Sequence, residues 1–406
     1  MTVNQLPKGE VLSLPKGWEV KKLGEICIVI AGQSPEGKYY NNEGKGRPFY
    51  QGKKEFNEKY LGNPTTWTTK TTKEADENDI LMSVRAPVGP VNFSTQNICI
   101  GRGLAAIRAG CLIDKEFLFN FLLKHEVEIV GNTGAVFNSI NKAQIEAISI
   151  PLPPLPEQKR IVSILDNAFE SVSIAKNNAE KNLKNARELF DSYLQSVFAH
   201  PGEDWEEKKL GEVTSKIGSG ATPRGGNESY KTEGISLIRS MNVHDRYFKE
   251  KNLAFIDEKQ AKDLNNVTIE EKDVLFNITG ASVTRCCVMS KEYLPARVNQ
   301  HVSIIRARHD VINATFLNLL LTSKPYKDKL LFTGEQGATR QAITKVQLQN
   351  FIISFPKSLS EQQSIVEKLD ALFAETKKLE AIYQKKLDDL DELKKSILDK
   401  AFKGEL

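Results

Sequence analysis

Residues 32–39 come closest in this sequence to a catalytic or ligand-binding motif. They read Gly-Gln-Ser-Pro-Glu-Gly-Lys-Tyr, which has the glycine and lysine spacing of a phosphate-binding loop. Such a loop needs a serine or threonine hydroxyl to ligate Mg²⁺ where Tyr39 stands, and Pro35 interrupts the backbone cradle for the phosphates. The second half of the chain also lacks the motif at Gly218–Pro223. We therefore expect no nucleotide site here.

The other reactive side chains show no spacing typical of catalysis or metal binding. The five histidines have no metal-ligand spacing, and His301 lies in a strand-like run, where a structural role is expected. The five cysteines include no C-x-x-C pair, which argues against a zinc site or a disulfide framework. Residues 63–66 lack the second proline of the Asn-Pro-Pro-aromatic signature of methyltransferases. The sequence predicts no catalytic residue and no metal site.

Composition is that of a chain with buried cores. Of 406 residues, 40% are hydrophobic and 27% are charged, which is typical of globular proteins rather than disordered or membrane proteins. Lysine and arginine exceed aspartate and glutamate by 56 to 52, a net charge of +4 that permits nucleic-acid binding without indicating it. No apolar run is long enough for a membrane span or a secretory signal. We expect a cytoplasmic protein with reduced cysteines.

Two stretches of sequence occur twice, in the same order. Trp18–Ile26 recurs as Trp205–Val213, and Leu155–Phe169 recurs as Leu359–Phe373. Weaker matches lie between these anchors: Ser34-Pro35 with Thr222-Pro223, Asp79–Leu81 with Asp273–Leu275, and Gly134–Ile140 with Gly337–Ile343. The chain is therefore predicted to be an internal repeat, in which a globular domain is followed by a long helix and the same order is then repeated.

Each globular domain is predicted to be mixed α/β. Short runs rich in β-branched residues are separated by clusters of Gly, Pro and Asn. Each copy also contains one longer helix-like stretch, Lys115–Val130 in copy one and Ala314–Leu331 in copy two. We expect the two domains at residues 1–154 and 204–357.

The two copies differ most at residues 30–75 and 217–270. Both regions are rich in Gly, Lys, Asn and Tyr. A repeated scaffold with different loops suggests two related tasks aimed at different targets, and the alternative is that surface loops have simply diverged.

Residues 155–203 and 358–406 are predicted to form long helices with a coiled-coil pattern. Apolar residues recur at a and d positions over about five heptads in each segment. The predicted seam consists of Ile161, Leu165, Val172, Leu189 and Tyr193 in the first helix and Ile365, Leu369, Leu372, Leu379, Tyr383, Leu390, Leu393 and Ile397 in the second. Pro156 suits a first-turn position, and Ser360 with Gln363 resembles a capping box, so both helix starts are marked.

The two helices are expected to pair with each other. Small residues of the first helix, such as Ala179 and Ala186, correspond to Tyr383 and Leu390 in the second, and small residues facing large ones favour pairing of unlike helices. The predicted fold is therefore α/β, with two mixed α/β domains joined by an antiparallel coiled coil and related by a pseudo-two-fold axis. The alternative is a plain hairpin of two surface helices packed on a core.

This order of parts resembles the specificity subunit of type I restriction–modification enzymes. The resemblance rests on the paired Trp-Glu-x-Lys-Lys-Leu-Gly-Glu segments, the Thr222-Pro223 turn, Val298–His301 and the proline-rich run Pro151–Gln158. It covers residues 14–406. Copy one departs from copy two at Cys99–Arg102.

The resemblance implies two target-recognition domains, each reading half of a split DNA sequence. The helices would then set the gap between the half-sites and dock two copies of a methyltransferase subunit, with motor-nuclease restriction subunits joining the complex. It further implies that partner subunits bind S-adenosylmethionine, ATP and Mg²⁺. This chain would then hold no cofactor and carry out no catalysis.

Base readout in the major groove needs Arg, Lys, Asn or Gln side chains on loops. The candidates are Gln33, Lys38, Asn41, Asn42, Arg47, Gln51, Lys53 and Lys54 in copy one and Thr222, Arg224, Asn227, Lys231, Arg239 and Asn242 in copy two. Gln51 and Arg239 occupy equivalent places after a short strand and are the best candidates for a base contact. The rival hypothesis is a coiled-coil protein-interaction scaffold without sequence-specific DNA binding.

Overall fold

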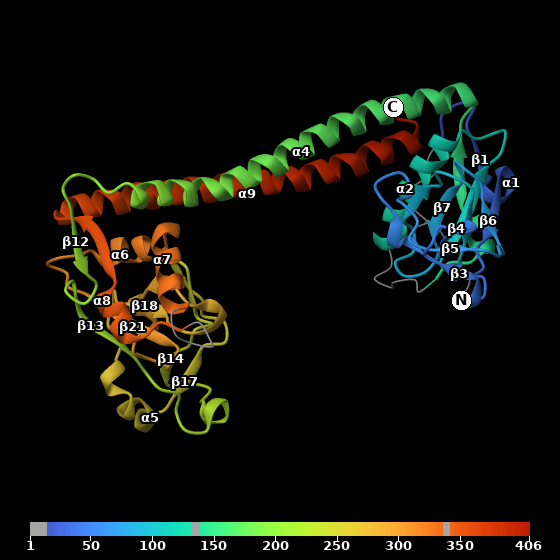
Figure 1. Ribbon diagram of the computed structural model, residues 1–406. Coiled ribbons are helices and arrows are strands. Elements are labelled where there is room, and N and C mark those ends of the chain that lie inside the picture. Colours follow the sequence, from blue (N-terminus) through green and yellow to red (C-terminus); the bar gives the residue numbers. More distant parts are fainter. Residues whose placement is uncertain (1–13, 132–138, 336–341) are drawn as a thin grey trace. The chain divides into compact units, whose positions relative to one another are not determined.

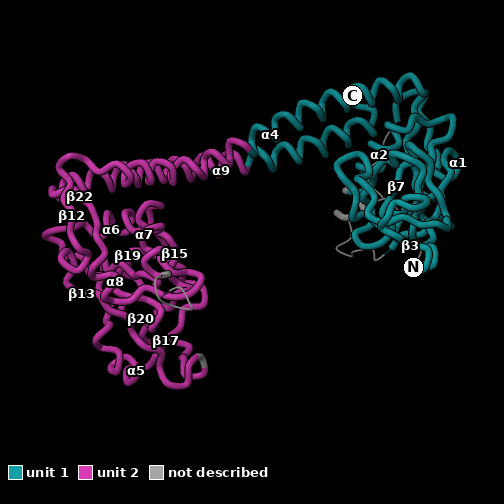
Figure 2. Tube along the Cα trace, in the orientation of Figure 1, with its two compact units in different colours: residues 1–180, 385–406 teal, residues 181–384 magenta. Residues whose placement is uncertain are grey.

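The computed structural model describes residues 14–131, 139–335 and 342–406. The chain divides into two compact units, residues 1–180 with 385–406 and residues 181–384 (Figure 2). Each unit contains one globular part and a portion of both long helices, α4 (Leu155–Ala199) and α9 (Leu359–Lys403). No helix within the described residues is long and apolar enough to cross a membrane.

The globular part of unit 1 contains two main sheets (Figure 1). The four-stranded antiparallel sheet has the order β2 (Cys27–Ala31), β10 (Leu104–Ala109), β7 (Ile80–Ser83), β8 (Val91–Phe93). The five-stranded sheet has the order β3 (Tyr40–Asn41), β5 (Trp67–Thr68), β4 (Arg47–Tyr50), β9 (Ile98–Ile100), β6 (Glu74–Ala75). The remaining elements are β1 (Glu19–Lys22), which pairs with β11 (Ser149–Leu152), and the helices α1 (Leu23–Ile26), α2 (Lys115–Gly131) and α3 (Lys142–Glu146). Only β4 and β9 run parallel among these pairs.

The globular part of unit 2 repeats this plan. Its four-stranded antiparallel sheet has the order β13 (Thr214–Ser219), β21 (Val302–Ala307), β18 (Val274–Asn277), β19 (Cys286–Val288). The second sheet has the order β17 (Ala254–Ile256), β14 (Ile235–Ile238), β20 (Ala296–Val298), and β14 and β20 run parallel. Two-stranded pairs join β12 (Trp205–Lys209) to β22 (Ile352–Pro356) and β15 (Val243–His244) to β16 (Tyr247–Phe248). The helices are α5 (Glu258–Asp263), α6 (Ala314–Thr322), α7 (Lys324–Glu335) and α8 (Lys345–Asn350).

Each unit has its own hydrophobic core between the four-stranded sheet and its helices. In unit 1, Ile80 and Phe117 are buried together, and Val274 and Phe316 are buried together in unit 2. Burial of side chains of this size stabilises the fold by about 1.5–3 kcal/mol each. The mixed α/β prediction is confirmed, and both copies use the same strand order in the four-stranded sheet.

An ion pair with a buried carboxylate occurs at the same place in both copies. Arg108 binds Asp79 through two hydrogen bonds of 2.9 and 2.8 Å, and Arg306 binds Asp273 through two of 2.8 Å. Both carboxylates are buried. Each pair ties one strand of the antiparallel sheet to the turn before its neighbour, which explains why Asp-Ile-Leu in copy one matches Asp-Val-Leu in copy two.

A buried glutamine anchors the start of each long helix. Gln158 Oε1 accepts from the Asp114 N–H (2.7 Å), and its Nε2 donates to the carbonyls of Leu112 and Pro153. Gln362 repeats all three bonds, with the Asn313 N–H and the carbonyls of Val311 and Pro356. Because both amides are fully buried and satisfied, the repeated glutamine at each helix start has a structural explanation.

The long helices contact each other within each unit. In unit 1, the Lys176 Nζ lies 2.9 Å from an Asp391 carboxylate oxygen, and Lys394 lies over the Phe169 ring. Residue numbers rise along α4 while those of the contacted residues fall along α9, so the helices run antiparallel there. In unit 2, Arg187 pairs with Glu380 and the ring of Phe190 packs edge-on against Phe373, again with opposite chain directions.

Burial along the helices follows the predicted seam only in part. Ile161, Leu165, Val172 and Leu369 are buried, and Ile365, Leu372, Tyr383, Leu390 and Ile397 are partly buried. Leu189, Tyr193, Leu379 and Leu393 are exposed. Near the end of α4, Phe190 and Leu194 are buried in their place, because this part of the helix packs on the core of unit 2. A 3.6-residue helix also drifts relative to a strict heptad repeat.

Candidate nucleic-acid interface

The ends of two parallel strands meet in copy one. Tyr50, the last residue of β4, lies opposite Ile100, the last residue of β9. Gln51 and Gly101 therefore follow the strands side by side, and the Gly101 N–H donates to the Tyr50 carbonyl (2.8 Å). Residues just beyond strand ends lie on loops, where binding side chains are commonly presented.

Gln51 is held in this position by a hydroxyl. The Ser34 Oγ donates to Gln51 Oε1 (2.9 Å), and the Arg102 N–H donates to the same Oγ (3.3 Å). A Cβ atom at Gly101 would lie 2.6 Å from Gln51 Oε1, so only glycine lets the amide approach so closely. The result is an exposed glutamine whose carbonyl end has a fixed partner.

The same strand ends meet in copy two. Ile238 of β14 lies opposite Val298 of β20, and the Asn299 N–H donates to the Ile238 carbonyl (3.0 Å). Arg239 thus occupies the place of Gln51, as the sequence predicts, and Asn299 that of Gly101. Asn299 is buried, and its Oδ1 accepts from the His301 N–H (3.0 Å), which shapes the loop after β20.

A chain of four side chains crosses the loop after β20. The Thr222 hydroxyl donates to Gln300 Oε1, and Gln300 Nε2 lies 3.1 Å from His301 Nε2. Since an amide nitrogen can only donate, His301 Nε2 accepts and its Nδ1 carries the proton. That Nδ1–H donates to the Thr279 hydroxyl, 2.6 Å away. Both ends of the exposed Gln300 amide are therefore held.

The other predicted residues of copy one lie around its loops. Lys38 pairs with Glu36 (2.6 Å), and Arg47 lies 3.7 Å from Glu74. Asn41 stabilises its own turn, because its Oδ1 accepts from two backbone N–H groups and its Nδ2 donates to a carbonyl. The side chains of Gln33, Asn42, Lys53 and Lys54 are also exposed.

Two predicted residues of copy two are engaged inside the protein. Asn242 is fully buried and bonds the Arg239 N–H and the Lys249 carbonyl. The Arg239 guanidinium donates to the Asn252 carbonyl and lies 5.3 Å from the Tyr230 ring centroid, and its Nε is buried without a partner among the described residues. Of the rest, Arg224 and Lys231 are exposed, and Asn227 lies outside the residues whose side chains are described.

Sequence reasoning missed a basic cleft in copy one. A cavity of about 470 Å³ is lined by residues that include Arg85, Arg102, Lys142 and Asn141, and none of the described residues that line it has a carboxylate side chain. Arg85 forms an isolated bridge with Ser139, Lys142 is the first residue of α3, and Arg102 follows β9. The available signal was the position of Arg85 and Arg102, two residues after the buried strands β7 and β9. The equivalents of Arg85 and Arg102 in copy two are Thr279 and Gln300.

Both copies of the repeat match one protein-family model. A family model described as the type I restriction modification DNA specificity domain matches residues 15–185 and again residues 202–388. Each match begins near the start of one globular part and ends within a long helix. The chain belongs to the type I restriction–modification specificity family.

Individual relatives agree. A specificity subunit of Methanocaldococcus jannaschii, MjaX, is 43% identical over 192 residues, and the alignment covers 46% of this chain and less than half (45%) of that relative. The EcoBI specificity subunit of Escherichia coli is 22% identical over 98% of this chain and 88% of its own length.

Solved structures share the fold. One is a chain from a structure described as the structural basis underlying complex assembly and conformational transition of the type I R-M system, with a TM-score of 0.75, 23% identity and coverage of 97% of this chain and 99% of that one. Another is the HsdS subunit of Thermoanaerobacter tengcongensis, with a TM-score of 0.62, 23% identity and coverage of 97% and 98%.

Three buried thiols of this chain are poorly suited to nucleophilic chemistry. Burial raises the pKa of Cys27 to about 11 and that of Cys287 to about 12, and it raises the pKa of Cys286 well above its ordinary value. A thiol with such a pKa stays protonated at neutral pH and is a poor nucleophile. Within the described residues, no group of three or more His, Cys, Asp or Glu side chains could hold a metal ion.

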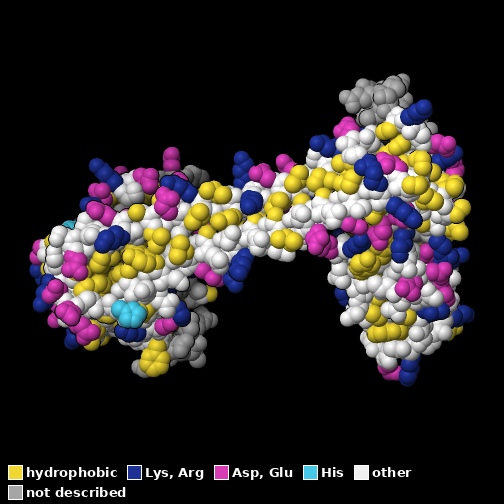
Figure 3. Space-filling model, turned by 90° about the horizontal axis from the view of Figure 1, so that it is seen from above, with side chains coloured by type: hydrophobic (Ala, Val, Ile, Leu, Met, Phe, Trp, Pro, Cys, Tyr) yellow, Lys and Arg dark blue, Asp and Glu magenta, His cyan; other side chains and the backbone are white. Residues whose placement is uncertain are grey.

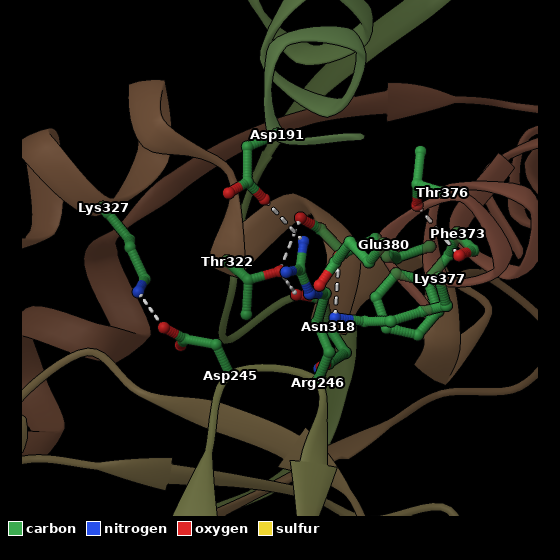
Figure 4. A network of polar contacts seen from close by, with 11 residues as sticks. Asp191, Asp245, Arg246, Asn318, Thr322, Lys327, Phe373, Thr376, Lys377 and Glu380 are labelled. Carbon is green, nitrogen blue, oxygen red and sulfur yellow. Dashed lines mark hydrogen bonds and ion pairs between the residues drawn. The ribbon is translucent and has the colours of Figure 1, made fainter. Parts of the chain in front are cut away.

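A polar network attaches the turn between β15 and β16 to the helices of unit 2 (Figure 4). Arg246, in the turn between β15 and β16, donates to Asp191 of α4 (3.1 Å). Its guanidinium carbon lies 4.4 Å from the Phe190 ring centroid and 5.7 Å from that of Phe373. Next to it, Asp245 pairs with Lys327 of α7. A cation between two aromatic rings contributes about 0.5–2 kcal/mol, which fixes this turn on the helices.

Proposed function

We propose that this chain is the DNA-reading subunit of a type I restriction–modification complex and recognises a target in two halves. The observation that carries the proposal is the repeated strand-end loop, which presents an amide side chain held by a hydroxyl in each copy, Gln51 by Ser34 and Gln300 by Thr222. Amide side chains pair with base edges in the major groove. Two such loops on two separate domains fit two half-sites.

The spacer role is part of the proposal. The two long helices form an antiparallel coiled coil that sets the distance between the half-sites, and a pseudo-two-fold axis relates the copies. Each helix has 45 residues, or about 68 Å at 1.5 Å per residue. That length is about two turns of DNA, because half-sites one turn apart are about 34–36 Å apart.

The helices also dock two copies of a methyltransferase subunit, and motor-nuclease subunits join the complex. Hydrophobic side chains are visible at the surface along the helices (Figure 3), and large exposed ones include Ile174, Leu189, Ile382 and Leu393. Such apolar surface is typical of a protein-interaction site. The partner subunits bind S-adenosylmethionine, ATP and Mg²⁺, and this chain contributes no catalysis. The complex acts in the cytoplasm.

The test is a base-resolved methylome of cells that contain the methyltransferase partner, with and without this gene. We expect methylation of one gapped, two-part motif to disappear without the gene. The exposed apolar residues of the helices also fit the rival function, a protein-interaction scaffold. An unchanged methylome with the partner expressed would favour that scaffold.

A further inference from the structure

We infer that Gln300, rather than Arg239, is the base-reading side chain of copy two, and that it reads an adenine. This inference rests on the proposed function and names a contact within it. Gln300 is exposed, and it follows the end of β20 by two residues. Arg239 is half-buried, and its guanidinium is already bonded to the Asn252 carbonyl and stacked near Tyr230.

The hydrogen bonds to Gln300 leave a defined set of free positions. A glutamine amide has two N–H groups and two lone pairs on its oxygen. Thr222 takes one lone pair and His301 takes one N–H, so one acceptor and one donor remain. Adenine offers an acceptor at N7 and a donor at N6 in the major groove, which is the complementary pair.

The relay behind Gln300 makes the side chain rigid before DNA binds. His301 is fixed by the Thr279 hydroxyl at Nδ1 and by the Asn299 side chain at its backbone N–H. A long side chain that is already immobilised loses less conformational entropy on binding, which increases affinity and selectivity. We therefore assign Thr222, His301 and Thr279 as positioning residues for Gln300.

Copy one supports the assignment independently. There, Ser34 stands at the position of Thr222 and also donates to a glutamine, Gln51. The two glutamines come from different strands: Gln51 follows β4, whereas Gln300 follows β20, the equivalent of β9. The repeated feature is thus a hydroxyl-held glutamine beside paired strand ends, not a particular position in the sequence.

The experiment uses the full chain in complex with its methyltransferase partner. The motif of the unchanged complex is determined first, and binding is then measured for DNAs that carry each single base change in either half-site. We expect Gln300→Ala to reduce discrimination at one A·T pair of one half-site by about 5- to 150-fold and to leave the other half-site unchanged. Gln349→Ala, which removes an exposed glutamine on α8, is the matched control and should change neither half-site.

The positioning residues are tested by the same readout. Thr222→Val should reduce selectivity at the same base pair, and Thr222→Ser should preserve it because serine keeps the hydroxyl. The inference is overturned if Gln300→Ala leaves selectivity unchanged, weakens binding to all sequences equally, or changes selectivity at a G·C pair. It is also overturned if Arg239→Ala, and not Gln300→Ala, reduces selectivity in that half-site. If the complex that contains the unsubstituted chain recognises no gapped motif, the proposed function is overturned, and this inference with it.

Discussion

The two copies place one glutamine and one arginine around the same pair of strand ends, but in exchanged positions. Copy one has Gln51 after β4 and Arg102 after β9, whereas copy two has Arg239 after β14 and Gln300 after β20. In both copies a hydroxyl donates to the glutamine, from Ser34 in the loop after β2 and from Thr222 in the loop after β13. The backbone frame is common to both copies, and the side chains placed on it differ.

The surroundings of these strand ends differ more than the strands do. In copy one, Arg102 and Arg85 line a basic cleft. In copy two, Gln300 and Thr279 occupy the corresponding places and are joined through His301. One copy therefore offers charge where the other offers a fixed hydrogen-bonding edge, and the two halves of the proposed target would be contacted by different chemistry.

The largest expected effect tests the common frame. Asp273→Ala should lower the free energy of unfolding by about 3 kcal/mol, because Arg306 loses two charge-assisted hydrogen bonds to its buried partner and keeps the more exposed Glu270. Asp79→Ala should do the same in copy one. Asp310→Ala, in an exposed pair with Arg308, is the control and should change stability by less than about 1 kcal/mol. Chemical denaturation measures all three, and a negligible loss for Asp273→Ala would show that the pair does not stabilise the frame.

The second prediction concerns the attachment of each helix. Gln362→Leu should cost about 1–3 kcal/mol, since the Asn313 N–H and two carbonyls lose their partner. Gln158→Leu should cost a similar amount. Hydrogen exchange should locate the change at the start of α9 in the first variant and of α4 in the second. If only one variant were destabilised, the two glutamines would not have equivalent roles in the two copies.

These frame residues were the most predictable part of the protein. Asp79 with Asp273 and Gln158 with Gln362 stand in segments that recur along the chain. Their side chains bind an arginine or backbone N–H and C=O groups inside the scaffold, so both copies need them. The mixed α/β class followed from the short β-rich runs and the helix-like stretches, and the equivalence of Gln51 and Arg239 from their places after a short strand. The α4 seam was less predictable near Leu189, because packing on the globular core buries Phe190 instead.

The strand-end loops were less predictable because their contacts join distant segments. Thr222 and Gln300 are 78 residues apart, and Ser34 and Gln51 are 17 apart, so residue type alone could not reveal which polar side chains are held. Asn242 has the right type for base contact but is buried in a turn. The net charge only permitted nucleic-acid binding, and the strand register was needed to show which residues surround the candidate interface.

The third prediction sharpens the comparison of the two half-sites. Gln51→Ala should relax one base position in the half-site that Gln300→Ala leaves unchanged, at a cost of about 1–3 kcal/mol in discrimination. Competition binding with single-base variants of both half-sites measures it. If both substitutions affected the same half-site, the two copies would not read separate halves.

The smallest expected effect concerns the basic cleft, which distinguishes copy one. A lysine or arginine that contacts a phosphate increases affinity for every sequence, so Arg85→Ala should weaken cognate and random DNA alike. It should also reduce the slope of log affinity against log salt concentration by about one. Thr279→Ala at the equivalent place in copy two should leave that slope unchanged, because no charge is removed. A loss confined to cognate DNA would instead make Arg85 a base reader, and copy one would then read through charge as well as through Gln51.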